Sequence, residues 1–427
     1  MGRCSECGAW NSFVEEVSHR PATTSPGRPA VSKAIPISKV NLGDGGEVRM
    51  RLGIGELDRV LGGGLVTGSL VLLGGDPGVG KSTLLLLAMC AFAGRGLRVL
   101  YVSGEESARQ VRLRAERLGA LSDELYLLAE TSLDAVKVAV EEVKPRVLVL
   151  DSVQTLHNPA LDGVPGSISQ VREVAAQAMG ISKGQDIATF LVGHVTKEGN
   201  LAGPRTLEHL VDTVLYFEGD GSGPLRVLRA TKNRFGSTGE IGLFEMREDG
   251  LAEVPDASAR LLNERAEDAP GSVVTCTMEG SRPILVEVQA LTGRPTPGTP
   301  GRTAVGIDRS RLLLLLAVLA RAGIDLSDRD VFVSVAGGVR VAEPAVDLAI
   351  AIALHSSVMQ RPVERDLLVF GEIGLAGEVR GVSSPLLRLR EAERHGFRTA
   401  LVPGSTPPEG GAMRLRMVRT LREALGD

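Results

Sequence analysis

The sequence of 427 residues is poor in aromatic side chains and cysteine, and it has no long apolar run. Phe, Trp and Tyr together make up 3% of the chain, which leaves few rings on which nucleic-acid bases could stack. The longest apolar runs, residues 84–93 and 312–320, fall well short of the about 20 residues that span a bilayer. We therefore expect no membrane span. Since no basic stretch leads into an apolar segment at the N-terminus, we expect a cytoplasmic protein.

The chain also lacks a strong excess of charge of one sign. Its 48 basic and 52 acidic residues give a net charge of -4, so DNA binding would need local patches or an assembled channel. Four cysteines are too few for disulfide bonds to stabilise a chain of this length. Cys90 and Cys276 lie in apolar surroundings and are interpreted as inert core residues. The 43% hydrophobic residues suffice for a sizeable core, and the length indicates two to three domains.

The order of patterns along the chain indicates an α/β fold followed by an α+β domain. Apolar, β-branched runs alternate with helical patterns between residues 47 and 262, which predicts a mostly parallel sheet covered on both faces. The expected parts are a small cysteine-containing module (1–18), a Pro/Ser/Gly-rich linker (19–46), the α/β domain (47–262), a charged linker (263–270) and the α+β domain (271–427).

The expected elements can be placed by residue number. Strands are predicted at 69–74, 98–103, 124–129, 146–151, 188–193, 213–218 and 225–231, and in the second domain at 273–277, 284–290 and 331–336. Helices are predicted at 81–93, 107–118, 311–322 and 344–356.

A phosphate-binding loop lies between the first of these strands and the first of these helices. The pattern G-x-x-x-x-G-K-[ST] lets backbone N–H groups and a helix N-terminus face phosphate oxygens. We expect Lys81 to reach the β- and γ-phosphates of ATP and Ser82 to ligate Mg²⁺. The predicted nucleotide site consists of Gly75, Asp76, Pro77, Gly78, Val79, Gly80, Lys81, Ser82 and Thr83.

Polar residues at the ends of three further strands are candidates for the same site. Asp151 ends an apolar strand, where a carboxylate positions Mg²⁺. Glu105 is the first candidate for the residue that polarises the attacking water, and Glu106 is the second; either could instead favour the dipole of the following helix. His194 is a candidate sensor of the γ-phosphate, or else only a local hydrogen-bonding group.

The basic turn Lys232, Asn233, Arg234, Phe235 and Gly236 is a further motif. In this order after the phosphate loop and Asp151, it resembles the motif of the bacterial DNA repair protein RadA family, also called Sms. The resemblance covers essentially the whole chain and implies a RecA-like ATPase core followed by a Lon-protease-like domain.

The resemblance implies a DNA-dependent ATPase that acts in homologous recombination. Members form hexameric rings, translocate on single-stranded DNA, promote branch migration of branched intermediates and work with the RecA recombinase. Lys232 and Arg234 are then expected at the subunit interface, where they couple one nucleotide to the neighbouring subunit and to DNA. Channel loops with Lys197 and Arg205 are the expected DNA contacts.

Two departures from the family pattern bear on metal binding and proteolysis. The family begins with a zinc finger of four cysteines, whereas only Cys4 and Cys7 are present, so we expect the chain to start inside the finger and to bind Zn²⁺ only if the finger is completed upstream. Ala345 and Leu386 stand where a Lon-type serine and lysine would be, so neither nucleophile nor base is available and no peptidase activity is expected.

Two questions stay open at this stage. The C-terminal arginines are interpreted as a solvated helical face, with a DNA-binding track as the alternative; they are Arg380, Arg388, Arg390, Arg394, Arg398, Arg414, Arg416, Arg419 and Arg422. The leading function is a ring-shaped DNA motor. Its alternatives are a nucleotide-switched recombination scaffold without motor activity and, disfavoured by Ala345 and Leu386, an ATP-dependent protease.

Overall fold

The computed structural model describes residues 36, 38, 49–194, 207–219, 225–263, 265–294, 300–408 and 411–426. By compactness the chain divides into Met1–Glu47 and Val48–Asp427, and the second unit contains two large sheets. The expected finer division into domains stays a prediction. Four residues named above lie outside the described residues: Cys4, Cys7, Lys197 and Arg205. Among the described residues no helix is long and apolar enough to cross a membrane.

The first sheet has nine strands in the order β11-β10-β9-β8-β3-β7-β6-β4-β5. Its strands are β3 (Leu70–Gly75), β4 (Val99–Ser103), β5 (Leu125–Ala129), β6 (Val147–Asp151), β7 (Ala188–Val192), β8 (Thr213–Gly219), β9 (Leu225–Asn233), β10 (Ile241–Arg247) and β11 (Gly250–Glu253). The six strands from β8 to β5 in this order are parallel, and β9, β10 and β11 extend the sheet antiparallel. A small pair, β1 (Arg49–Met50) and β2 (Leu65–Val66), precedes it.

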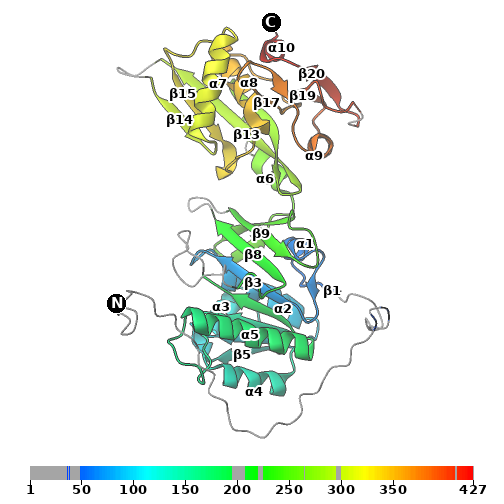
Figure 1. The fold of residues 1–427 in the computed structure, drawn as a ribbon. Coiled ribbons are helices and arrows are strands. Elements are labelled where there is room, and N and C mark those ends of the chain that lie inside the picture. The colour runs from blue at the N-terminus through cyan, green and yellow to red at the C-terminus, as the bar shows by residue number, and fades with distance from the viewer. Residues whose placement is uncertain are drawn as a thin grey trace. The chain divides into compact units, whose positions relative to one another are not determined.

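Helices cover both faces of this sheet, as its parallel strands require (Figure 1). Successive side chains of β3 enter different cores: Val71 and Leu73 pack with α1, α2 and α3, whereas Leu70 and Leu72 pack with α4 and α5. The helices are α1 (Gly55–Val60), α2 (Lys81–Ala93), α3 (Ala108–Arg117), α4 (Leu133–Val143) and α5 (Ile168–Gln185). The expected mostly parallel α/β sheet is therefore confirmed.

The second sheet is mixed and has the order β14-β15-β13-β12-β16-β19-β20. Its strands are β12 (Ser272–Glu279), β13 (Arg282–Gly293), β14 (Arg302–Val305), β15 (Asp330–Val335), β16 (Leu367–Val369), β19 (Thr399–Pro403) and β20 (Arg414–Val418), and β17 (Glu372–Ile373) pairs separately with β18 (Val379–Arg380). The accompanying helices are α6 (Ala257–Leu262), α7 (Arg309–Arg321), α8 (Asp347–Met359), α9 (Pro385–Arg394) and α10 (Leu421–Leu425), with 3₁₀ turns η3 (Ala336–Gly338) and η4 (Pro344–Val346).

The two faces of the second sheet also have separate cores. Leu312 of α7 and Leu348 of α8 pack on one face, and Leu389 and Ala392 of α9 pack on the other. The strands predicted at 273–277, 284–290 and 331–336 correspond to β12, β13 and β15. The alternation of strands and helices after residue 366 was not predicted, because these strands have only two to five residues and are too short to show a period.

The interpretation of the C-terminal arginines as a solvated helical face is wrong for Arg388, Arg414 and Arg416, whereas Arg390 and Arg394 are exposed on α9. Arg414 and Arg416 lie on the edge strand β20, and Arg388 is completely buried on α9. Arg388 donates to both oxygens of Glu343 and to the Cys276 and Ser383 carbonyls. Because these acceptors satisfy the guanidinium, α9 can turn Arg388 toward the sheet together with its apolar residues.

Candidate nucleotide site

The phosphate loop connects the completely buried strand β3 to helix α2. Gly75, Gly78 and Gly80 all have positive φ, at 151°, 77° and 112°. A Cβ at Gly75 would lie 2.3 Å from the carbonyl oxygen of Phe217, so only glycine fits there. Gly80 caps α2 without a side-chain hydrogen bond, which leaves the first-turn N–H groups to face an anion.

Lys81 lies at the start of α2 with 4% of its surface exposed. Its Nζ donates to the Gly75 carbonyl at 2.7 Å and to the Asp76 carbonyl at 2.9 Å. Burial lowers the pKa of Lys81, and the carboxylates of Asp151 and Glu105 offset this only in part. A phosphate would replace the two carbonyls as a fully charged acceptor, so the lysine is placed for the role predicted for it.

Asp151 ends β6 beside β4, and Tyr101 of β4 donates to its Oδ2 at 2.5 Å. Burial, followed by the charge of Asp151, raises the pKa of Tyr101 well above its usual value, so the phenol stays a donor. The Tyr101 hydroxyl also interacts with Ser82. A carboxylate and a hydroxyl thus converge around one phenol, and this hard oxygen set fits Mg²⁺. Bound there, Mg²⁺ would neutralise phosphate charge.

The two neighbouring glutamates have different environments. Glu105 Oε1 accepts the hydroxyl of Ser152 at 2.6 Å and faces His194 Nε2 at 3.0 Å. Glu106 instead pairs with Arg114 on α3. Burial raises the pKa of Glu105, but the hydrogen bonds of Ser152 and His194 outweigh it and the net pKa is lowered. Glu105 therefore lies among the site residues as a carboxylate, and the geometry favours it over Glu106.

His194 follows β7 and bridges the site. Its Nδ1 is 3.4 Å from Lys81 Nζ, and its Nε2 faces Glu105. The structure thus brings together Lys81, Ser82, Glu105, Asp151 and His194, from the ends of β4, β6 and β7 and from the start of α2. Tyr101 and Ser152 were given no role from the sequence. The only signal was their position at or near a predicted strand end. Their partners, Asp151 for Tyr101 and Glu105 for Ser152, lie 50 and 47 residues away in the sequence, so local spacing could not reveal these contacts.

The Lys232–Gly236 motif lies at the opposite end of the sheet from the phosphate loop. Asn233 pairs with Thr213 and Thr213 pairs with Val71, whereas Gly75 pairs with Phe217. The four steps along the strand from Val71 to Gly75 span about 13 Å. The motif therefore does not join its own chain's nucleotide site.

Within its own chain the motif contacts the segment before β8. Lys232 Nζ donates to the carbonyls of Glu208 and Val211 at 2.6 and 2.9 Å. Arg234, with a 57% exposed side chain, pairs with Asp212 at 3.2 Å. Asn233 Oδ1 accepts the N–H of Phe235, and Arg49 donates to the Phe235 carbonyl. The turn is held firmly while the Arg234 guanidinium stays accessible.

In the second sheet, the positions matching a Lon-type dyad carry no reactive group. Ala345 is buried in η4, and Leu386 lies in the first turn of α9. The ion pair of Arg388 with Glu343 lies near both, and burial of Glu343 is outweighed by this pair, which lowers the pKa of the carboxyl. This arrangement stabilises the domain but offers no nucleophile at either position.

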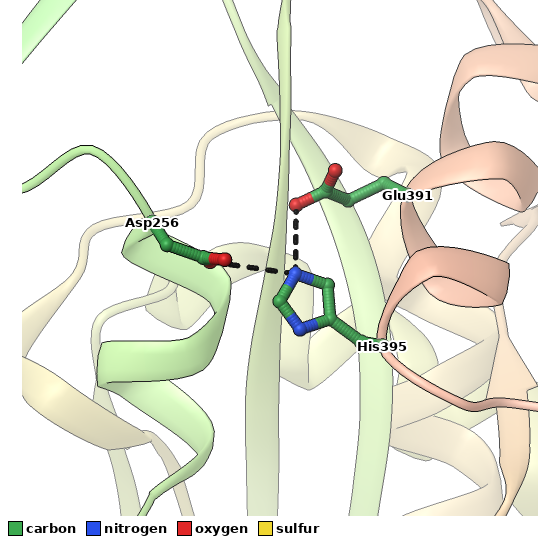
Figure 2. A group of neighbouring side chains, drawn as sticks. All are labelled: Asp256, Glu391 and His395. Carbon is green, nitrogen blue, oxygen red and sulfur yellow. Dashed lines mark ion pairs between the residues drawn. The ribbon is translucent and has the colours of Figure 1, made fainter.

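A group of polar side chains joins the start of α6 to the end of α9 (Figure 2). His395 Nε2 lies 3.4 Å from Asp256 Oδ1 and 3.3 Å from Glu391 Oε1. Arg394 donates to both carboxylates, and Ser258 donates to Glu391 at 2.6 Å. Since the carboxylates already have a cationic partner, we interpret the group as an ion-pair network that fixes α6 against α9.

The fold and site define a RecA-like P-loop ATPase core. A family model described as an AAA domain matches residues 53–200, and one described as subunit ChlI of Mg-chelatase matches residues 286–406. Among solved structures, a KaiC-like protein of Pyrococcus horikoshii aligns with 49% of this chain and all of its own at 21% identity and a TM-score of 0.40, values too low to bear on function.

Curated relatives cover nearly the whole chain. The DNA repair protein RadA of Pseudomonas aeruginosa is 51% identical over 99% of this chain and 94% of its own length. The RadA proteins of Bacillus subtilis and Streptococcus pyogenes are 49% and 50% identical, over 96% and 94% of this chain and 92% and 89% of their own. The chain therefore belongs to the family of the DNA repair protein RadA.

Proposed function

We propose that the chain is a DNA-dependent ATPase that works in homologous recombination as a ring-shaped motor on single-stranded DNA and promotes branch migration. ATP and Mg²⁺ are its cofactors, and Zn²⁺ would join them only with a completed finger. Its partners are single-stranded and branched DNA and the RecA recombinase. The oligomer is a hexamer, and the place of action is the cytoplasm.

The observation that carries this proposal is the separation of the Lys232–Gly236 motif from its own phosphate loop. A cation about 13 Å or more from the nucleotide of its own chain can serve ATP hydrolysis only on a neighbouring subunit. Arg234 is accessible for that purpose. A guanidinium supplied by a neighbour stabilises charge that develops on the γ-phosphate and makes hydrolysis depend on assembly.

The first test is ATP hydrolysis with and without single-stranded DNA. We expect stimulation by DNA that falls steeply with salt, because phosphate contacts release counterions. Lys81→Ala should abolish hydrolysis and Arg234→Ala and Lys232→Ala should reduce it strongly. Lys137→Ala, which removes an exposed lysine from α4, is the matched control. An equal rate of ATP hydrolysis with and without single-stranded DNA would contradict the motor and favour the nucleotide-switched scaffold.

Mixing the inactive Lys81→Ala variant with the strongly impaired Arg234→Ala variant tests the role of the neighbour directly. Lys81→Ala keeps its Arg234, and Arg234→Ala keeps its phosphate loop. If the motif acts between subunits, mixed rings contain complete sites and regain part of the activity. If it acts within one chain, the mixture stays as inactive as its components and the ring proposal loses its main support.

The alternative of an ATP-dependent protease predicts ATP-driven digestion of casein. Ala345 and Leu386 offer no nucleophile or base, so we expect intact casein alongside normal ATP hydrolysis. Lys81→Ala serves as the ATP-independent control. Cleavage that disappears in this variant would overturn the assignment of the second sheet as a non-proteolytic scaffold.

A further inference from the structure

Ser152 directly follows the Mg²⁺-binding candidate Asp151 and is completely buried. Its hydroxyl donates to Glu105 Oε1 at 2.6 Å, across the gap between the ends of β6 and β4. A serine hydroxyl can donate one hydrogen bond, and in this structure Oε1 of Glu105 accepts it. The contact is therefore specific to this carboxylate.

The backbone around Ser152 is held independently of Glu105. The Thr155 hydroxyl donates to the Ser152 carbonyl at 2.9 Å, and the N–H groups of Thr155 and Leu156 donate to the same carbonyl. The N–H of Ser152 in turn faces the Thr155 hydroxyl at 3.4 Å. Ser152 thus presents its hydroxyl from a fixed position, which is what a group that orients another side chain requires.

His194 supplies the second donor to the same oxygen. Its Nδ1 faces the Lys81 ammonium, which can only donate, so Nδ1 is the acceptor and Nε2 carries the proton. Oε1 of Glu105 consequently accepts two hydrogen bonds. Among the described residues no hydrogen bond to Oε2 is found, so Oε2 is the oxygen available to a water molecule.

The two donors also favour the ionised form of Glu105. Burial alone raises the pKa of a carboxyl group, but here the hydrogen bonds from Ser152 and His194 outweigh burial and the pKa is lowered. A base that takes a proton from water must be ionised at the working pH. The contacts to Oε1 favour that state.

We propose that Ser152 is a positioning residue that holds Oε1 of Glu105 and so directs its Oε2 toward the attacking water. The inference rests on the proposed function of ATP hydrolysis, with Glu105, the favoured candidate of the site, as its base. The water oxygen bonds to the γ-phosphorus, its proton passes to Oε2, and the bond from the γ-phosphorus to the bridging oxygen breaks. That oxygen keeps the electron pair, and ADP and inorganic phosphate leave.

The test compares kcat, KM for ATP and the pH dependence of kcat in Ser152→Ala, Ser152→Thr and wild type with DNA present. Loss of one hydrogen bond to a charged group, about 1.4 kcal/mol, predicts a roughly tenfold lower kcat with KM unchanged. The acidic limb of the profile should move to higher pH, because Glu105 is protonated more easily without the donor. Ser152→Thr keeps the hydroxyl and should restore both.

Two further variants make the outcome decisive. Ser182→Ala removes an equally buried hydroxyl from α5 and should leave kcat and the acidic limb unchanged. Ser152→Cys keeps the size with a weak donor and should move the limb part of the way, which serves if Ser152→Ala does not fold. The inference would be overturned if the acidic limb of Ser152→Ala or Ser152→Cys lay at the wild-type pH. It would also be overturned if Ser152→Thr lost as much kcat as Ser152→Ala.

Glu105→Gln separates this inference from the function on which it rests. If Glu105→Gln hydrolyses ATP at the wild-type rate, Glu105 is not the base and both statements fail. If Glu105→Gln is inactive while Ser152→Ala behaves as wild type, the base assignment survives and only the role of Ser152 is wrong.

Discussion

Single buried carboxylates organise much of this molecule, and Asp212 shows how. It lies directly before β8 with 3% of its surface exposed. It accepts the Leu70 N–H at 3.0 Å, Lys183 of α5 at 2.6 Å and Arg234 at 3.2 Å. Burial would raise the pKa of Asp212, but these partners outweigh it and the pKa is lowered. One carboxylate thus fixes the motif turn to the phosphate-loop strand.

Asp212→Asn should destabilise the protein at neutral pH by about 1–3 kcal/mol. A lowered pKa means that the stabilising contribution is complete above the usual carboxyl range and is lost as the pH falls through the folded-state value. The difference in thermal midpoint from wild type should therefore shrink as the pH falls below about 4. Asp134→Asn, at an exposed pair on α4, is the control and should show no such convergence.

At the scale of elements, α9 is amphipathic in an unusual way, because its inner face carries an arginine as well as apolar residues. Leu389 and Ala392 belong to the core that α9 forms with the second sheet, and Arg388 lies over the Phe370 ring with 5.9 Å to its centroid. The neighbouring Arg390 is exposed. The same residue type thus packs inside or faces solvent depending on its place around the helix.

Arg388→Ala should cost about 3–5 kcal/mol, because it leaves the half-buried Glu343 carboxylate without its cation. The expected result is a fall of roughly 10 °C in the thermal midpoint. Arg390→Ala should change it by less than about 2 °C. Equal effects of the two variants would show that the ion pair does not hold α9 in place.

At the scale of the whole molecule, a buried ion pair links the two sheets within Val48–Asp427. Glu56 of α1 is 2% exposed, accepts Arg282 from the start of β13 at 2.6 Å and accepts the Leu243 N–H at 2.9 Å. Arg282 also donates to the Pro255 carbonyl. A charged contact thus connects the first sheet to the second.

Arg282→Ala should destabilise both α1 and the start of β13, since the carboxylate of Glu56 loses its closest cation. We expect hydrogen exchange to rise in α1 and in the β12–β13 hairpin at the same time. Arg365→Ala removes an arginine from a pair with Glu267 that is more than two-thirds exposed, and it should raise exchange in neither. A change confined to the hairpin would show that the pair does not couple the sheets.

The sequence alone determined the local features of this protein. The phosphate loop, the strand ending in Asp151 and the basic Lys232–Gly236 turn could all be read from it, because their chemistry depends on residues a few positions apart. The same holds for most strands of the first sheet, whose buried apolar runs are continuous. The choice between Glu105 and Glu106 stayed open, since adjacent residues share one local pattern.

Only the tertiary structure decided which distant groups meet. The strand order β3-β7-β6-β4 brings Lys81, His194, Ser152 and Glu105 together, and the pairing of β8 with β9 sends the Lys232–Gly236 motif to the opposite end of the sheet. Arg388 is buried because Glu343, 45 residues away, lies opposite it. Such contacts follow from the order and direction of strands, which local spacing does not encode.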